Sequence, residues 1–286
     1  MRSDELKPLL ESLYASRSSR HLANDPLSFC HRFTEGADRE VAGLIASSFA
    51  YGKVSIILRN LEQVFSLIGP SPRSFVEDFR PRQGLRLFSG FRHRFNDHRD
   101  LCALLLAARL MIAESGSIGG FFRQGYDPAA EDVGCALSSF SARVLALDYS
   151  PVFGRGALSP GFRYLFPSPA GGSACKRLCM YLRWMVRGED GIDLGVWGGI
   201  DAAKLVIPVD VHIDRLARCL GLTTRGQADW RTAREITAAL RRLDPRDPVK
   251  YDFSLCHLGI SEGCDGTDSD GCGACLIAGA CTRLSG

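Results

Sequence analysis

The chain has 286 residues, of which 45% are hydrophobic, so it is long enough to fill one large core or two modest lobes. Its net charge of +3 at pH 7 is too small to indicate a polycation that binds nucleic acid through bulk charge alone. The sequence has no apolar start of signal-peptide type and no run of about 18 uncharged apolar residues, so we expect a cytoplasmic protein without a membrane segment. In that reducing compartment, eleven cysteines predict metal binding or redox chemistry rather than structural disulfides.

Apolar residues three and four apart predict helices along most of the chain, whereas the alternating patterns typical of strands are scarce. The helical patterns cover residues 38–68, 100–114, 174–187 and 230–243. Asp229 precedes the last of them at an N-cap position. Breaks rich in Gly, Pro and Ser punctuate the helices more than they separate domains, and they fall at 69–72, 166–172 and 188–199. The sequence therefore predicts an all-α fold.

Four cysteines near the end of the sequence form its most specific pattern. They are separated by seven, two and five residues, and they are Cys264, Cys272, Cys275 and Cys281. The two-residue gap lets two thiolates reach one metal centre from a single turn, which suits either tetrahedral zinc or a cubane [4Fe-4S] cluster. Four thiolates serve both, so the ligand type leaves that choice open. The other seven cysteines are scattered, and we expect them to be small core residues.

Three segments resemble the helix-hairpin-helix DNA glycosylase superfamily and occur in the same order as in that family. Residues 249–259, leading into Cys264, look like the closing helix and cluster loop of endonuclease III and the adenine glycosylases. Residues 207–216 resemble the Val-Asp-Thr-His-Ile-x-Arg motif that holds the catalytic aspartate of the superfamily. Residues 41–53 are similar to the early helix that ends in a residue plugging the DNA stack. The chain also looks like an uncharacterised bacterial family, recognisable by residues 176–187 and 247–251.

The resemblance implies a two-lobed fold with double-stranded DNA across the cleft between the lobes. Residues 1–40 would pack on the C-terminal lobe, 41–165 would form a helical barrel lobe, 166–210 a hairpin-like region with an insertion and the catalytic Asp, and 211–286 the C-terminal lobe with the four-cysteine loop. The family carries a [4Fe-4S] cluster with nearly the same cysteine spacing, so we expect that cofactor, with zinc as the alternative. The cluster loop is acidic, so phosphate would repel it, and we expect the cluster to stabilise its lobe rather than to contact DNA. The acidic residues of the loop are Asp265, Asp268 and Asp270.

The resemblance also implies which residues carry the chemistry of base removal. Asp210 would stabilise the sugar as the glycosidic bond breaks; the alternative is that it only caps the following helix. Lys176 would attack C1′ and form a Schiff base; the alternative is a surface lysine or a phosphate contact, with Lys204 as the reserve nucleophile. The hairpin turn that contacts DNA in this family would be Gly171-Gly172. It departs from the family because Lys176 follows Gly172 by four positions, and the longer separation from Lys176 to Asp210 is similar to that in the archaeal 8-oxoguanine glycosylases.

Chemistry on a base requires that the base be flipped out of the duplex and the vacancy filled. Tyr51 would fill it, and Lys53 would bring a positive charge to the nearby phosphate. The alternative for Tyr51 is a core tyrosine at a helix end. Trp184, Phe49 and Trp197 either line the base pocket or belong to the core, as aromatic residues at helical spacing usually do.

The first functional hypothesis is a DNA glycosylase with AP-lyase activity that excises an oxidised base, either 8-oxoguanine or an oxidised pyrimidine, in base excision repair. Its partner would be double-stranded DNA containing a damaged base, and we expect it to act as a monomer. The second hypothesis is a non-catalytic protein of the same fold that recognises distorted DNA or RNA, which the irregular hairpin supports. The third is a zinc-stabilised helical module without nucleic acid.

Overall fold

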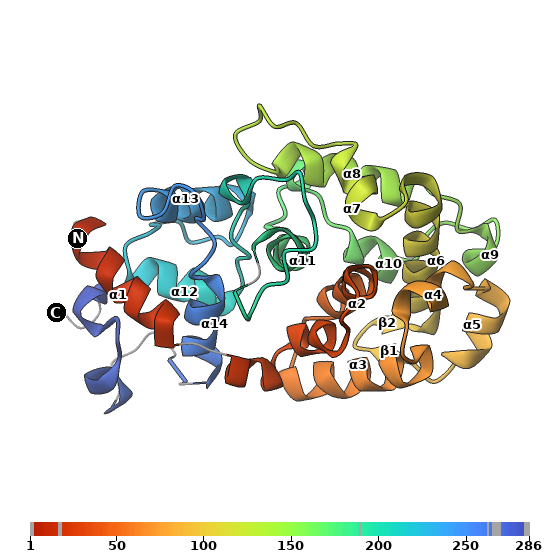
Figure 1. Ribbon diagram of the computed structural model, residues 1–286, viewed down its shortest axis with the longest axis horizontal. Coiled ribbons are helices and arrows are strands. Elements are labelled where there is room, and N and C mark those ends of the chain that lie inside the picture. Colours follow the sequence, from red (N-terminus) through yellow and green to blue (C-terminus); the bar gives the residue numbers. More distant parts are fainter. Residues whose placement is uncertain (1–2, 17–18, 189, 262, 265–269, 283–286) are drawn as a thin grey trace.

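A computed structural model of the protein describes residues 3–16, 19–188, 190–261, 263–264 and 270–282 (Figure 1). Helices make up 62% of the structure and strands 2%, so the prediction of an all-α fold is confirmed. Within the described ranges, no helix is both long enough and apolar enough to cross a membrane.

Helices follow one another along the whole chain, separated by short connections. The α-helices are α1 (Ser3–Ser16), α2 (Gly36–Ser48), α3 (Val54–Ile68), α4 (Pro72–Glu77), α5 (Pro81–Leu87), α6 (His98–Ser115), α7 (Ile118–Arg123), α8 (Gly134–Leu145), α9 (Ser150–Phe153), α10 (Pro160–Leu165), α11 (Lys176–Val186), α12 (Val211–Cys219), α13 (Trp230–Arg241) and α14 (Asp252–Ser261). Short 3₁₀ turns lie between them: η1 (Ser19–Asn24), η2 (Pro26–Arg32), η3 (Pro169–Gly171), η4 (Ala202–Lys204), η5 (Asp270–Ala274) and η6 (Ala278–Ala280).

The helices gather into two groups, with α11 between them (Figure 1). In the larger group α6 packs against α4, α5, α7, α9 and α10. At the other end of the molecule α14 packs against both α1 and α12. η2 packs against α2, so residues 26–32 belong to the larger group of helices. The sequence had instead predicted that all of residues 1–40 would pack on the C-terminal lobe.

The apolar pattern over residues 38–68 is divided between two helices. α2 ends at Ser48 and α3 begins at Val54, so the intervening residues form a turn. Gly52 has a φ of +98°, which a residue with a side chain rarely adopts, and this fixes the break at that point. The turn places Tyr51 beside the central helix α11 rather than in the middle of a long helix.

A small β-hairpin, which the sequence did not predict, connects α5 to α6. Strands β1 (Arg92–His93) and β2 (Asn96–Asp97) pair antiparallel, with His93 opposite Asn96. Arg94 in the turn has a φ of +55°. This conformation is uncommon for a residue other than glycine, and here the tight turn between the two strands requires it. β1 packs against α3 and β2 against α6 and α10, so the hairpin is anchored on both sides.

α11 is buried on nearly all sides, as expected for a helix at the centre of the molecule. Tyr181 and Trp184 on this helix are at most 1% exposed. Its polar side chains therefore need partners inside the protein. Arg177 donates to the carbonyl of Ser48 at 2.6 Å and to the carbonyl of Tyr164, and so ties α11 to the end of α2 and to α10.

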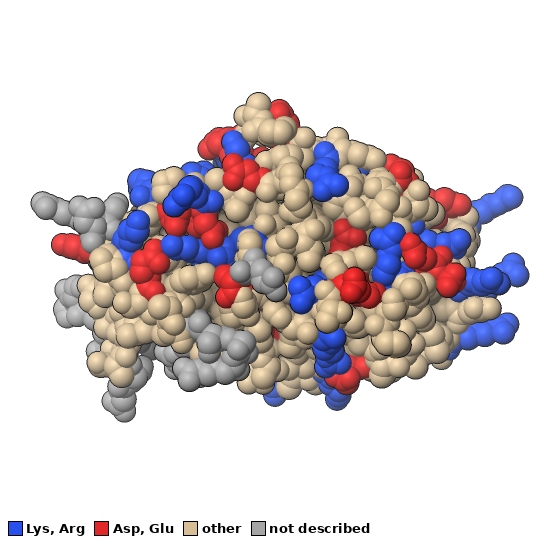
Figure 2. Space-filling model, viewed as in Figure 1, with Lys and Arg blue, Asp and Glu red and all other residues tan. Residues whose placement is uncertain are grey.

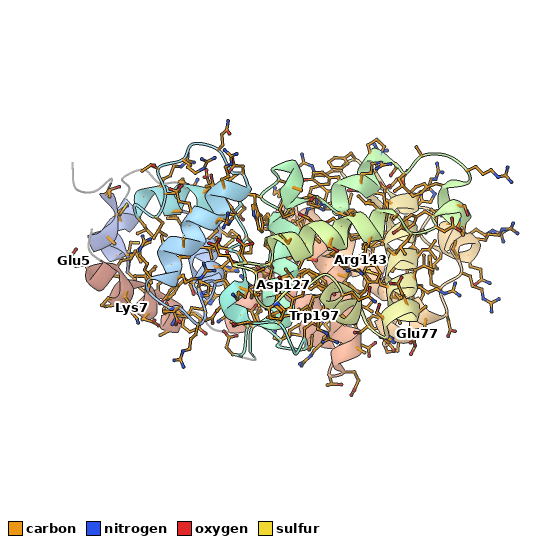
Figure 3. The ribbon with its side chains drawn as sticks, turned by 90° about the horizontal axis from the view of Figure 1, so that it is seen from above. Glu5, Lys7, Glu77, Asp127, Arg143 and Trp197 are labelled. Atoms are coloured by element: carbon orange, nitrogen blue, oxygen red, sulfur yellow. The ribbon has the colours of Figure 1, made fainter. Side chains whose placement is uncertain are left out.

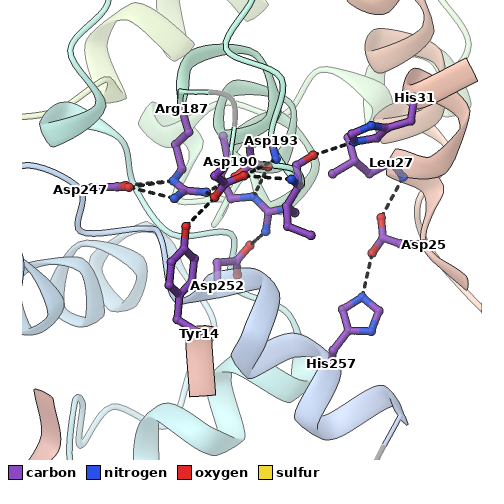
Figure 4. Close-up of polar contacts among 12 residues, drawn as sticks. Tyr14, Asp25, Leu27, His31, Arg187, Asp190, Asp193, Asp247, Asp252 and His257 are labelled. Atoms are coloured by element: carbon purple, nitrogen blue, oxygen red, sulfur yellow. Dashed lines mark hydrogen bonds and ion pairs between the residues drawn. The ribbon is translucent and has the colours of Figure 1, made fainter. Parts of the chain in front are cut away.

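Buried ion pairs connect the far end of α11 to α14 and to the loop that follows α11 (Figure 4). Arg183 pairs with Asp193 at 3.1 Å and with Asp252 at the start of α14. Arg187 pairs with Asp193 and, through two nitrogens, with Asp247 at 2.9–3.0 Å. The loop after α11, which the sequence had identified as part of an apparent insertion, thus supplies the carboxylate of Asp193 to both arginines, and the same arginines bind Asp252 and Asp247 of the C-terminal segment.

Candidate active site

A cleft of about 590 Å³ opens beside α11, and residues from both groups of helices line it. Its volume lies within the range of roughly 300–1,000 Å³ that is usual for small-ligand sites. The polar residues that line it come from widely separated parts of the sequence and include Asp25, Tyr51, Lys176, Asp210, Asp252 and Cys256. The cleft therefore brings together both residues that the sequence proposed for catalysis.

Asp210 is the N-cap of α12, and its two carboxylate oxygens have different partners. Oδ1 accepts hydrogen bonds from the backbone N–H groups of His212 at 2.9 Å and Ile213 at 3.0 Å. Oδ2 accepts from the Cys256 thiol at 3.6 Å and lies 3.8 Å from Nζ of Lys176. Capping and a place in the cleft are thus compatible, because one oxygen caps the helix while the other faces the lysine.

Lys176 is the first residue of α11 and is partly exposed in the cleft. Its Nζ donates to the carbonyl of Ala50 at 3.3 Å and completes the pair with Asp210. A cation at a helix N-terminus gains nothing from the helix dipole, which favours negative charge there. The lysine therefore does not stabilise the helix through the dipole. Its amine is instead held in position by the carboxylate of Asp210 and the carbonyl of Ala50.

Tyr51 lies at the mouth of the cleft, where its ring is half-buried. Its hydroxyl donates toward the carbonyl of His93 at 3.2 Å and to the side-chain oxygen of Asn96. Burial raises the pKa of Tyr51, so the phenol stays neutral. The two turn residues after it, Gly52 and Lys53, are exposed. Lys53 is the N-cap residue of α3, and its side chain is accessible to anions in solution.

The turn before α11 is where the sequence placed a DNA-contacting hairpin. Gly171 and Gly172 are exposed, and Gly172 has a φ of +81°. The carbonyl of Gly172 accepts a hydrogen bond from the N–H of Trp230 at 3.2 Å, which fastens the turn to the start of α13. Cys175, just before Lys176, also has a positive φ of +50°. The turn is therefore tight and fixed at both ends, with its two glycines presented to solvent.

Of the aromatic residues considered for a base pocket, only Trp184 lines the cleft. Trp197 lies deep between helices (Figure 3), where its indole N–H donates to Glu40 Oε1 at 2.7 Å and its ring packs on Tyr181. Phe49 is fully buried and lies outside the cleft lining. Lys204, the reserve nucleophile, is also outside the lining, and its Nζ donates to the carbonyl of Ala130 at 2.8 Å.

Three acidic or thiol groups in the cleft were not predicted from the sequence. Burial, together with the nearby Asp210 charge, raises the pKa of Asp252 to about 6 against the opposing effect of Arg183. Burial also raises the pKa of Cys256 well above its ordinary value, so the thiol keeps the proton that it donates to Asp210. For Asp25, burial is outweighed by hydrogen bonds from His257 and a backbone N–H, which lower its pKa.

The four cysteines follow α14, and the described part of this segment contacts α1 through η6 and α12 through Cys264 and Thr282. Cys272 and Cys275 are joined by a turn in which the N–H of Cys275 donates to the carbonyl of Cys272 at 3.1 Å. All four cysteines, Cys264 and Cys281 included, are half-buried. This donor set fits a four-thiolate centre, but within the described residues no three ligating side chains converge on one point. Asp265 and Asp268 of the acidic loop lie outside the described residues.

Comparison with known proteins identifies the family of this chain. A family model described as "Protein of unknown function (DUF2400)" matches residues 25–261. The chain belongs to this DUF2400 family. The part shared with DUF2400 begins at Asp25 and ends with α14, so it contains the cleft residues Lys176 and Asp210 and stops before the four cysteines. No curated protein and no solved structure matches the chain.

Proposed function

We propose that this protein is a DNA glycosylase with AP-lyase activity that removes an oxidised base from double-stranded DNA. The observation that carries the proposal is the 3.8 Å approach of Lys176 Nζ to Asp210 Oδ2 inside a cleft lined by both groups of helices. An amine beside a carboxylate in a cleft is the arrangement that nucleophilic catalysis at a sugar carbon requires. The family resemblance had singled out the same two residues independently of their distance.

Lys176 would attack C1′ of the damaged nucleotide. The amine must be neutral to attack, and Asp210 Oδ2 lies within ion-pair distance to receive its proton. The amine lone pair forms the bond to C1′ while the electrons of the glycosidic bond leave with the base, which takes up a proton. Opening of the sugar ring gives a Schiff base, and loss of a C2′ proton then expels the 3′ phosphate and cleaves the strand.

Asp210 would also stabilise the positive charge that develops at the sugar as the base departs. The two backbone N–H groups on Oδ1 hold the carboxylate in one orientation, so Oδ2 remains directed toward the amine. The Cys256 thiol supplies a third hydrogen bond to the same carboxylate. A carboxylate fixed in this way loses little freedom when the transition state forms.

The test is incubation with duplexes that each carry one lesion, 8-oxoguanine or an oxidised pyrimidine, with and without borohydride. We expect base release, strand cleavage and a borohydride-trapped protein–DNA adduct on at least one lesion. Lys176→Ala should abolish the adduct, whereas Lys204→Ala, which removes a lysine outside the cleft, should retain it. Absence of released base and of adduct across the lesion panel would reject the proposal.

A second candidate function is the binding of distorted nucleic acid without catalysis. The observation that favours it is the backbone strain at Cys175, directly before Lys176, in a turn that departs from the family pattern. This function predicts salt-sensitive binding that Asp210→Asn leaves intact, with no chemistry on any lesion. Base release by the wild-type protein would exclude it.

We propose further that the four cysteines hold a [4Fe-4S] cluster, with zinc as the alternative. Their segment is anchored on the helix that follows Asp210, because Thr282 donates to the carbonyl of Cys219 at 2.9 Å and Arg215 donates to the carbonyl of Cys264. When bound, the cluster would supply a rigid cross-link of this segment. Its role would be to fix α12, and with it Asp210, rather than to react with DNA.

A further inference from the structure

Two exposed aromatic side chains meet at the mouth of the cleft. Phe95, in the turn of the β-hairpin, is 54% exposed, and Tyr164, on α10, is 44% exposed. Their ring centroids are 4.8 Å apart with an angle of 79° between the planes. Single exposed apolar residues are ordinary on protein surfaces, but two exposed rings in contact at the rim of a cleft form a defined apolar surface.

The two rings rest on the side chain of Tyr51, which lines the cleft. Its ring centroid lies 5.6 Å from that of Phe95 and 5.3 Å from that of Tyr164. The guanidinium of Arg177 lies over Tyr164 at 4.1 Å and over Tyr51 at 5.1 Å. Because Arg177 is buried and donates to two carbonyls, it fixes the rings from the protein side.

The hairpin that carries Phe95 is held rigidly. The side chain of Asn60 donates to the carbonyl of Arg92 at 3.0 Å and contacts His93 Nδ1 at 3.0 Å. His93 Nε2 in turn bonds to the carbonyl of Tyr51 at 2.9 Å, and Asn96 donates to Asp100 at 2.8 Å. A fixed ring loses little conformational freedom when it inserts into another molecule.

Three exposed cations lie on the hairpin and on the turn that follows Tyr51, beside the exposed carboxylate of Asp97. Arg92 and Arg94 of the hairpin are exposed, and Lys53 is exposed in the turn after Tyr51. The Arg94 side chain crosses that turn closely enough that a Cβ on Gly52 would lie 3.2 Å from it. The face drawn in Figure 2 carries both signs of charge and is not uniformly basic.

A small pair of aromatic rings bordered by cations fits a nucleobase with its flanking phosphates. Aromatic side chains stack on bases of any sequence, and inserted apolar side chains fill a step where stacking is broken. A protein partner of ordinary size would require an apolar area well beyond two side chains. The cations would meet the phosphates on either side of the stacked base.

We propose that Phe95, backed by Tyr164, enters the DNA stack and packs on the unpaired base that faces the flipped nucleotide. This inference rests on the proposed function, because it takes the bound ligand to be duplex DNA with one nucleotide in the cleft. Tyr51, for which the sequence had predicted this role, instead packs against the ring of Phe95. The contacts of its hydroxyl with the hairpin hold Tyr51 in that position.

The test uses a short duplex with a tetrahydrofuran abasic analogue, which presents an unpaired base without needing catalysis, and the same duplex undamaged. We expect Phe95→Ala to weaken binding to the abasic duplex by about 5- to 150-fold, the ratio that corresponds to loss of one stacked base. Phe95→Trp should retain the affinity, with its tryptophan emission quenched on binding. Leu87→Ala, which removes a side chain that is 44% exposed on α5, is the matched control and should bind like the wild type.

Equal affinity of Phe95→Ala and the wild-type protein for the abasic duplex would overturn the inference, as would equal weakening on abasic and undamaged duplexes. Thermal unfolding of each variant shows whether it is folded. The inference and the proposed function fail separately. If the wild-type protein releases no base but binds the abasic duplex through Phe95, the glycosylase proposal fails and the stacking surface stands. If it releases base and Phe95→Ala binds normally, only the stacking surface fails.

Discussion

Asp193 is predicted to be the most sensitive single position for stability in the network around α11. Its side chain is fully buried and is shared between Arg183, at 3.1 Å, and Arg187. Asp193→Ala would leave both guanidinium groups in place with one buried acceptor fewer. Removing one partner of a buried ion pair costs about 3–5 kcal/mol, and the lower end of this range applies here because Arg183 keeps Asp252 and Arg187 keeps Asp247 as partners. We therefore expect the free energy of unfolding to fall by about that amount.

Urea denaturation followed by circular dichroism measures this loss. The matched control is Glu62→Gln, which breaks the pair with Arg32 on the surface, where the two side chains are 59% and 42% exposed. Exposed pairs contribute about 0–1 kcal/mol, so this variant should unfold close to the wild type. A loss below about 1 kcal/mol for Asp193→Ala would refute the argument that this carboxylate stabilises the buried pair of arginines at the end of α11.

Three further predictions concern the site. Asp210→Asn should reduce base release by about 10²- to 10⁴-fold while leaving the unfolding free energy nearly unchanged, because Asn is as good an N-cap as Asp. Folding lowers the pKa of Asp25, so its carboxylate should stabilise the folded protein at pH values above its ordinary pKa of 3.8. This contribution should be lost as the pH falls through the lower pKa that Asp25 has in the folded protein. Purified protein should be brown with absorbance near 400 nm, and Cys272→Ser should lose iron and colour.

Each of these has a direct check. Base release and denaturation of Asp210→Asn are measured on the same preparation, and a large loss of stability would mean that the activity loss reports misfolding. For Asp25, the difference in unfolding free energy between the wild type and Asp25→Asn should shrink below pH 4; a difference that grows on acidification would contradict the sign. For the metal, elemental analysis that finds one zinc and no iron in colourless protein would replace the cluster by the zinc alternative.

The helical character of the fold could be predicted because it depends on local periodicity. The N-caps at Asp210 and Asp229 could also be predicted, because a short acidic side chain directly before an apolar helical run can accept hydrogen bonds from the first N–H groups of the helix. The break at Gly52 was missed because apolar spacing continues across it, and only the positive φ reveals the turn. The β-hairpin was missed because two-residue strands are too short to show an alternating pattern.

The candidate site could be predicted only where a sequence motif covered it. Asp210 lies in a segment that resembles the superfamily, and Lys176 follows the turn that stands in place of the family's hairpin; the fold brings the two residues together. Asp25 and Asp252 line the same cleft, but they come from distant segments and neither belongs to a catalytic motif. The exposure of Phe95 likewise depends on the hairpin, so an aromatic residue between Arg94 and Asn96 in the sequence gave no signal of a surface ring.

Peptide mapping of a borohydride-trapped complex shows whether Lys176 is the nucleophile of a base-excising lyase. The wild-type protein is reduced on a lesion-containing duplex, digested with protease and nuclease, and sequenced by mass spectrometry. We expect the residual sugar to be attached to Nζ of Lys176. Attachment to another lysine, or the absence of any attached sugar on a duplex that the protein binds, would contradict this expectation.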